Sequence, residues 1–215
     1  MTSNLFGVTS TDMPILSYNF GSIGKKILIL GGVHGDEIEG VWCALHLLNT
    51  WSKSFSYKLQ MTLVPQFNID GILLKKRTNF NGVDLNRNLK TKDWSPEVKT
   101  ERYHPGPFAG SEKENQSLMT WLDLNKPDFI ISLHSWKPLI NVNGHCEPFA
   151  SQLSAHTGYI IEETIGYPTP GCLGTYTGLE RNIPTVTYEI ERGLSQQEVC
   201  KTHPHAICEA LKTLE

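Results

Sequence analysis

The sequence lacks an excess of positive charge. Its 215 residues include 19 Lys and Arg against 22 Asp and Glu, which gives a formal net charge of -3. Proteins that hold nucleic acid or an anionic membrane by charge carry a basic surface. The composition gives no support for either partner, so small solutes or peptides are the expected ones.

Long apolar runs are missing as well. No run approaches the roughly 18 residues that a membrane-spanning helix needs. The N-terminus, Met1 to Gly7, also lacks the cationic segment and apolar segment of a secretory leader. We therefore expect a soluble, cytoplasmic protein, unless a leader has been removed from the sequence.

The sequence contains no cysteine pair with the CxxC spacing of a zinc clip or a redox site. Its five cysteines are also odd in number, which argues against a full set of disulfides. We expect reduced thiols, as is usual in a cytoplasmic protein. The five are Cys43, Cys146, Cys172, Cys200 and Cys208.

The apolar content that is present suffices for one core. At 215 residues and 39% hydrophobic, the chain is long enough for a substantial core and rather short for two domains. We expect a single domain over residues 1–215.

Apolar residues alternate between strand-like and helix-like patterns. Continuous runs are typical of buried parallel strands, and spacings of three and four are typical of helices. The run that begins at Ile27 and the strand at 58–64 enclose a helix that starts near Asp36, which makes a β-α-β unit with a right-handed crossover. Further strands are expected at 15–19 on the sheet edge, 128–136, 159–162 and 184–190, and further helices at 111–125, 147–156, 173–181 and from Ser195, interrupted or started near Pro204.

These elements predict an α/β fold with a mixed, mainly parallel central sheet and helices on both faces. Residues 65–110 stand apart, because they have little periodicity and many turn formers. A connection of that length is usually functional or disordered. Its segment 77–88, RTNFNGVDLNRN, is dense in side chains that bind carboxylates and carbonyls, so we expect a functional loop.

A histidine and a glutamate lie three residues apart just after the first strand, in ILILGGVHGDE. Ligands of open α/β sheets collect beyond the carboxyl ends of the strands. Imidazole and carboxylate both bind Zn²⁺, and a catalytic zinc takes three protein ligands and one water. His34 and Glu37 are therefore candidate ligands, and His134, near the end of another apolar run, is the best third candidate. The HxxE pair and a histidine at the end of a strand, each taken alone, also occur in proteins where they bind no metal.

Hydrolysis by a metal-activated water requires a base for the proton and a cation for the developing oxyanion. The strand at 184–190 places Glu189 near the same end of the sheet. Arg77 and Arg87 lie in the loop that covers that end. The sequence thus contains a candidate for each chemical requirement.

Four motifs occur in order: HGDE from His34, RTNxNGVDLNRN from Arg77, LHSW around His134, and TYE ending at Glu189. Together they resemble the zinc carboxypeptidase family, in its compact bacterial branch, over about residues 27–190. The resemblance implies a zinc carboxypeptidase-like fold, one Zn²⁺ per chain and hydrolysis of an amide in a small peptide. In the amidases of that branch, the bond is γ-D-Glu–meso-diaminopimelate in murein peptides, and the process is peptidoglycan recycling.

The resemblance also implies roles for the matching residues. His34, Glu37 and His134 would be the zinc ligands. Glu189 would be the general base that then protonates the leaving amine. Arg77 would stabilise the oxyanion.

Other residues of the resemblance concern the substrate. Asn86 and Arg87 would hold its terminal carboxylate, and Asp84 would organise the loop. The sequence departs from the animal digestive enzymes at Asp36, where they have an arginine, and in its shorter length. Those enzymes also carry a mobile tyrosine well upstream of the base, for which the nearest analogue here is Tyr176, a candidate substrate-binding residue.

Two rival functions stay open at this point. A deacylase of the aspartoacylase or succinylglutamate desuccinylase type shares the HxxE pattern and the downstream histidine. An inactive peptide-binding domain of the same fold would have no need of Glu189. The sequence does not determine the exact substrate, the oligomeric state or whether a second metal binds.

Overall fold

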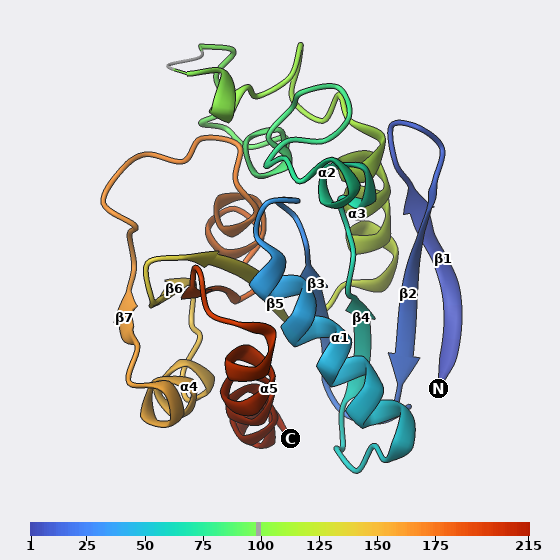
Figure 1. Cartoon of the computed structure of the whole chain (residues 1–215), viewed down its shortest axis with the longest axis vertical. Coiled ribbons are helices and arrows are strands. Elements are labelled where there is room, and N and C mark those ends of the chain that lie inside the picture. Colours follow the sequence, from blue (N-terminus) through green and yellow to red (C-terminus); the bar gives the residue numbers. More distant parts are fainter. Residues whose placement is uncertain (98–99) are drawn as a thin grey trace.

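The computed structural model describes residues 1–97 and 100–215, which form an eight-stranded sheet with helices on both faces (Figure 1). Four strand pairs are parallel and three are antiparallel, so the predicted mixed, mainly parallel sheet is confirmed. The strands in spatial order are β1 (Thr2–Val8), β2 (Pro14–Phe20), β4 (Gln60–Val64), β3 (Lys26–Gly31), β5 (Phe129–Trp136), β8 (Thr185–Glu191), β6 (Leu139–Asn143) and β7 (Ile160–Glu162).

The central strands β4, β3, β5 and β8 are parallel to one another. In β3, every residue after Lys26 is buried, and β5 is buried from Phe129 through Ser135, as continuous apolar runs predict. Ile29 lies opposite Leu63 of β4 on one side and Ile131 of β5 on the other. Helix α1 (Ile38–Lys53) connects β3 to β4, which confirms the predicted β-α-β unit.

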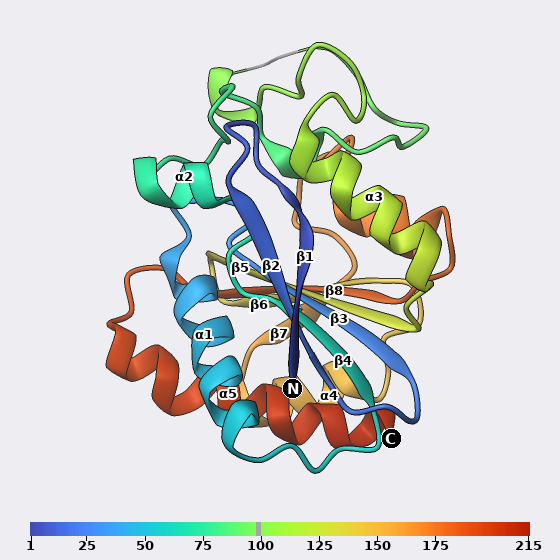
Figure 2. The same ribbon diagram turned by 90° about the vertical axis from the view of Figure 1, so that its right-hand side faces the viewer.

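Each face of the sheet has its own core. Helices α1, α4 (Phe149–Thr157) and α5 (Gln196–Leu211) cover one face, where Leu47 and Ile207 pack on the strands. Helix α3 (Lys113–Asn125) covers the opposite face, where Leu118 packs with Phe67 and Leu30 (Figure 2). The prediction of helices on both faces is confirmed.

Helix α5 begins after Ser195, as predicted. The Ser195 hydroxyl accepts from the Glu198 backbone N–H, and the Glu198 carboxylate accepts from the Ser195 N–H, which caps the first turn. The predicted interruption or start near Pro204 is wrong, because the helix continues through Pro204 to Leu211. Packing of α5 on the sheet outweighs the loss of one helical hydrogen bond.

Two strands have no counterpart in the predictions. In β1 only Phe6 is buried, so the strand has no apolar pattern, and it pairs outside β2 and takes the edge position expected for 15–19. Strand β6 is short and alternates between Ile140 and Val142 on one face and Asn141 and Asn143 on the other.

The long loop is ordered by side-chain amides. It contains the short helix α2 (Ile69–Leu74), capped by Asn68, whose side chain accepts from the Gly71 N–H. The buried Asn88 amide donates to the carbonyls of Pro105 and Phe108 at 2.7 and 3.1 Å. These hydrogen bonds act together with the apolar packing of Phe67, Leu85 and Leu89 in the core on the α3 face.

The carboxyl ends of β3, β5 and β8 meet at one edge of the sheet, below the long loop (Figure 1). His134 of β5 is the register partner of Glu189 of β8. Among residues 1–97 and 100–215, no helix combines the length and the apolar character that crossing a membrane requires.

Candidate metal centre and cleft

The turn between β3 and α1 carries two of the candidate ligands. His34 lies in the turn, and Glu37 is the residue that precedes the first turn of α1. Gly32 has a φ of 69°, which favours glycine, and a Cβ on Gly35 would lie 2.0 Å from the carbonyl carbon of Gly71. The glycines therefore allow this turn to pack directly against α2.

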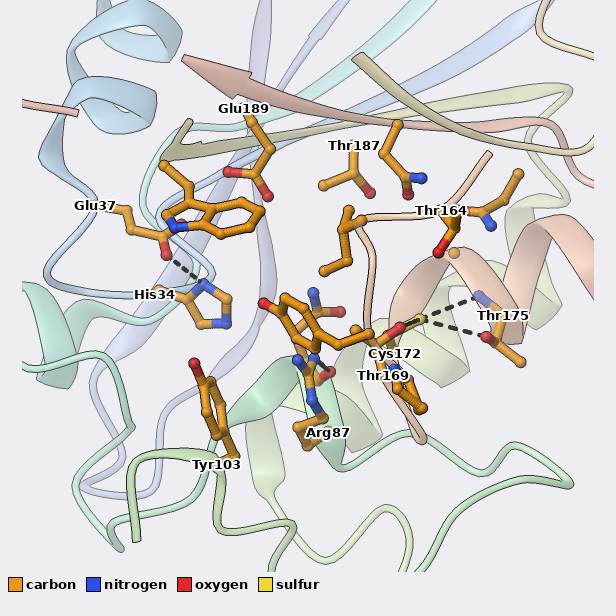
Figure 3. A pocket seen from close by; sticks show the side chains of 18 of the residues that line it. His34, Glu37, Arg87, Tyr103, Thr164, Thr169, Cys172, Thr175, Thr187 and Glu189 are labelled. Atoms are coloured by element: carbon orange, nitrogen blue, oxygen red, sulfur yellow. Dashed lines mark hydrogen bonds and ion pairs between the residues drawn. The ribbon is translucent and has the colours of Figure 1, made fainter. Parts of the chain in front are cut away.

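His34, Glu37 and His134 come together in space. Their ligand atoms all lie within 4.8 Å of one another, and all three residues are buried. The Nδ1 atoms of His34 and His134 are 2.9 and 2.8 Å from the two oxygens of Glu37, and 3.1 Å from each other. Figure 3 shows His34 and Glu37 directed toward each other at one end of the cleft. The predicted trio is one compact donor set.

The outer nitrogens of both histidines have their own partners. His34 Nε2 lies 3.0 Å from Asp84 Oδ1, and His134 Nε2 lies 2.9 Å from Ser132 Oγ. Partners of this kind fix the tautomer and the orientation of a metal-binding imidazole. Both Nδ1 atoms thus face the space shared with Glu37, and two imidazoles with one carboxylate fit a zinc ion.

The charges of this centre shift one another's pKa values. Burial opposes ionisation of Glu37, but the imidazoles of His34 and His134 outweigh it and hold the Glu37 pKa well below its usual range. Burial and Arg77 lower the His34 pKa, and the carboxylates of Glu37 and Asp84 more than compensate, so that pKa is raised. The two carboxylates therefore favour positive charge beside them.

Arg77 joins the two carboxylates beside the histidines. Its Nη1 donates to Glu37 Oε1 at 3.0 Å and its Nε donates to Asp84 Oδ2 at 2.9 Å. Despite burial, Asp84 and Glu37 raise the pKa of the Arg77 guanidinium, and His34 and Arg77 lower the pKa of Asp84. Asp84 does organise the loop, through the Asn86 N–H at 2.9 Å, but it also orients a candidate ligand, which sequence reasoning missed.

Glu189 lies beside His34, Glu37 and His134, and only 8% of its surface is exposed to solvent. Burial raises its pKa to about 7, assisted by the Glu37 carboxylate and opposed by His134 and Arg77. Its Oε2 atom is buried and has no hydrogen-bond partner within the described part of the chain. A buried carboxylate with an unpartnered oxygen is suited to accept a proton from a substrate or a water.

A cleft of about 500 Å³ is lined by His34, Glu37, Arg77 and Glu189. Asn86 and Arg87 of the short helix Leu85–Arg87 belong to the lining. The Asn86 Oδ1 accepts from the Leu173 N–H at 2.8 Å, and the Arg87 Nη1 donates to the Asn86 carbonyl at 2.6 Å. The Arg87 guanidinium lies 5.5 Å from the centre of the Tyr103 ring.

The structure does not bring Tyr176 to the cleft. Its ring is buried in the core on the α3 face, under the Arg181 guanidinium at 3.4 Å. Tyr167 and Tyr103 line the cleft instead, together with Trp136, whose ring centre is 6.0 Å from that of Tyr167. Sequence reasoning missed Tyr167, although its position in the turn-forming GYPTPG segment indicates a loop.

Two further arginines line the cleft and were also missed. Arg102 and Arg192 are exposed and both donate to the Oδ2 atom of Asp36, at 3.2 and 3.5 Å. Asp36 immediately precedes Glu37. Neither arginine belongs to one of the four motifs, and a basic residue in a loop gives no sequence signal of its own.

Comparisons of the sequence with known proteins find similar proteins. The sequence model described as zinc carboxypeptidase matches residues 12–196. A murein peptide amidase A of Vibrio campbellii is 30% identical over 177 residues, which cover 76% of this chain and 68% of that protein. The protein of the same name in Escherichia coli K12 is 29% identical over 200 residues, which cover 86% and 78%.

Solved structures share the fold. The crystal structure of the murein-tripeptide amidase of Escherichia coli O157 superposes with a TM-score of 0.83 at 23% identity, covering 99% of this chain and 92% of that one. Bovine thrombin-activatable fibrinolysis inhibitor gives a TM-score of 0.84 at 18% identity, covering 99% and 88%.

Proposed function

This chain belongs to the zinc carboxypeptidase family, and on that premise we propose that it hydrolyses the γ-D-Glu–meso-diaminopimelate bond of murein peptides. The proteins named murein peptide amidase that resemble it, over most of their length and of this chain, support this substrate. A cytoplasmic place in peptidoglycan recycling and a single domain over residues 1–215 are parts of the same proposal.

The metal part of the proposal is one Zn²⁺ per chain, held by His34, Glu37 and His134. The orientation of both Nδ1 atoms toward Glu37, fixed from behind by Asp84 and Ser132, supports this ligand set. Zinc held there would act as a Lewis acid, which would polarise the scissile carbonyl and lower the pKa of water.

The proton transfers fall to Glu189. Its carboxylate accepts a proton from the attacking water and passes it to the nitrogen of the leaving amine, so that the amide C–N bond breaks as the amine becomes neutral. The single observation that carries this role is a buried carboxylate beside the trio, with a raised pKa and an unpartnered oxygen. An inactive binding domain has no use for such a group.

Arg77 is proposed to stabilise negative charge on the carbonyl oxygen during attack. Its guanidinium is already oriented by Glu37 and Asp84, and it lines the cleft beside His34. A donor that is fixed before the reaction needs no reorganisation when charge develops, which is the main source of electrostatic catalysis.

Arg87 and Asn86 are proposed to hold the carboxylate of the leaving residue. A guanidinium presents two parallel N–H groups that match a carboxylate. Hydrogen bonds from Leu173 to Asn86 and from Arg87 to the Asn86 carbonyl hold both side chains in the cleft wall.

The experiment that tests this function is hydrolysis of synthetic L-Ala-γ-D-Glu-meso-diaminopimelate by the zinc-loaded protein. Release of diaminopimelate is the expected result, and Glu189→Gln serves as the matched inactive control. Preferred release of a short acyl group from N-acyl amino acids would instead identify a deacylase. Binding of the peptide without any turnover would identify a peptide-binding protein.

A further inference from the structure

The cleft has an electropositive group at its mouth that the proposed chemistry leaves unused. The group consists of Asp36, Arg102 and Arg192, called the Asp36 trio below. Two guanidiniums share one carboxylate oxygen, at 3.2 and 3.5 Å, so the trio has a net charge of one positive unit. Glu37 also lies 3.4 Å from Arg192, but it interacts with Arg77 and both candidate histidine ligands as well.

Both arginines keep donor capacity for a ligand. A guanidinium has five N–H groups. Arg192 uses its Nε on the Ser135 carbonyl at 3.2 Å and its Nη1 on Asp36, and Arg102 uses one Nη2 hydrogen on Asp36. Their side chains are 37% and 47% exposed, so a solute in the cleft can reach the remaining N–H groups.

The Asp36 trio lies on one side of the proposed base, Glu189. Along β8, Thr187 and Glu189 share one face of the strand, about 7 Å apart, and both line the cleft. Arg192 follows the strand at the other side of Glu189. Figure 3 shows Thr187 and Thr175 on the opposite side of Glu189 from Glu37, which is the neighbour of Asp36.

The two sides of Glu189 correspond to the two halves of the substrate. Arg87, proposed to bind the leaving residue, is held near the segment that carries Leu173 and Thr175, on the Thr187 side. The acyl half of the substrate then extends toward Arg192 and Arg102. An ordinary peptide has an uncharged amide at that place, whereas a γ-linked glutamyl residue has a free α-carboxylate.

We propose that Arg192 and Arg102, oriented by Asp36, bind a carboxylate on the acyl side of the scissile amide, and so select γ-linked acidic residues there. This inference rests on the proposed function, because it assigns the two halves of the cleft from the proposed roles of Glu189 and Arg87. It makes the Asp36 trio a specificity determinant, distinct from the group that binds the leaving residue.

The test compares two peptides that differ only at the carboxylate in question: L-Ala-γ-D-Glu-meso-diaminopimelate and its α-amide, L-Ala-γ-D-isoglutaminyl-meso-diaminopimelate. The parent protein should cleave the free acid with a kcat/KM about tenfold or more above that of the amide, the lower end of what a charge-assisted bond gives. The preference should fall as salt is raised, since the arginines are solvent-accessible.

Arg192→Gln should lower kcat/KM for the free acid about tenfold and leave kcat/KM for the amide nearly unchanged. The substitution and the conversion of the carboxylate to an amide remove the same interaction. Arg192→Lys should keep part of the preference, and Lys113→Gln, which breaks an exposed ion pair with Asp12, serves as the matched control. If the role of Arg192 were purely structural, Arg192→Gln would lower kcat/KM equally for both peptides, and that result would overturn the inference.

Calorimetric binding of both peptides to Glu189→Gln separates this inference from the proposed function. Equal binding and equal cleavage of the two peptides overturn the inference and leave the function intact. Tighter binding of the free acid with no cleavage by the parent protein supports the inference and overturns the function. Neither binding nor cleavage of the free acid overturns both.

Discussion

Asp84 and His34 are joined by a hydrogen bond of 3.0 Å between Oδ1 and Nε2, across 50 positions of sequence. This contact connects the long loop to the β3–α1 turn and leaves the His34 Nδ1 free to face Glu37 and His134. The same carboxylate holds Arg77 through its other oxygen. A single buried side chain thus orients one candidate ligand and one candidate oxyanion donor.

The metal content of the protein should depend on this contact. We expect one zinc per chain in the parent protein and none in His34→Ala. Asp84→Asn should retain the ligands but bind zinc about 10- to 100-fold more weakly, as loss of an outer partner usually does. Metal analysis after dialysis against graded chelator measures both effects. A parent protein as poor in zinc as His34→Ala would refute the ligand assignment.

Glu189→Gln should retain zinc and lose turnover. Glutamine has nearly the same shape as glutamate but does not accept the proton, and loss of a general base costs about 10²- to 10⁴-fold in rate. Steady-state rates on the murein peptide, measured beside the zinc content, test this expectation. Loss of zinc in the variant, or an unchanged rate, would mean that Glu189 is not the base.

Arg87→Lys should impair substrates that have a free carboxylate on the leaving residue. Lysine does not reproduce the two-point geometry of a guanidinium, and a charge-assisted bond is worth about 1.5–3 kcal/mol, so kcat/KM should fall about 10- to 100-fold. Converting that carboxylate to an amide should impair the parent protein to a similar extent.

The two changes, Arg87→Lys and the amide cap, should be non-additive when they are combined, since both remove the same interaction. Simple addition of the two losses would show that Arg87 does not bind the carboxylate. A capped peptide that is cleaved as fast as the free one would show the same, and would favour the deacylase function.

His203 should make the protein sensitive to acid. Burial lowers its pKa to about 4, and its Nδ1 is hydrogen-bonded to the Tyr188 hydroxyl. The unfolded value is near 6.5, so its contribution is complete above that pH and is lost as the pH falls toward 4. The loss amounts to about 3 kcal/mol in the free energy of unfolding.

His203→Gln keeps an acceptor for Tyr188 without a titrating ring, so its stability should fall less between pH 7 and pH 4. Urea unfolding at several pH values measures the difference between the parent and the variant. His205→Gln, an exposed histidine on the same helix, is the control and should follow the parent protein. Parallel pH curves for the parent protein and His203→Gln would contradict the assignment.

The sheet could be predicted because its central strands are buried on both faces. Residues 27–31 are a continuous apolar run and 129–133 are apolar except for Ser132, a pattern that surface segments rarely have. Strand β1 escaped prediction because only Phe6 needs an apolar side chain there. Strand β6 escaped because it has only five residues, and two of them, Asn141 and Asn143, which line the cleft, are of a type that is rare in strands.

The candidate site was predictable where chemistry limits the choice of residue. A zinc ligand has few substitutes, so His34, Glu37 and His134 were identified from their types and positions, and the structure brings them together. Their roles, like those of Glu189, Arg77, Asn86 and Arg87, remain predictions. Tyr176 was chosen by distance along the chain, which says little about where a loop places a ring.

Gly35 and Gly71 have no reactive groups, yet they limit which substitutions this sequence can tolerate. Neither position has space for a methyl group. A Cβ on Gly35 would meet the backbone of Gly71, and a Cβ on Gly71 would lie 2.4 Å from the Asn68 Nδ2 and 2.7 Å from the Thr78 carbonyl oxygen. The Gly35 N–H also donates to the Arg77 carbonyl. A side chain at Gly35 would push the turn that carries His34 away from α2, and one at Gly71 would displace the segment that follows Arg77. In a saturation library, both positions should tolerate glycine alone, as strictly as the ligands themselves.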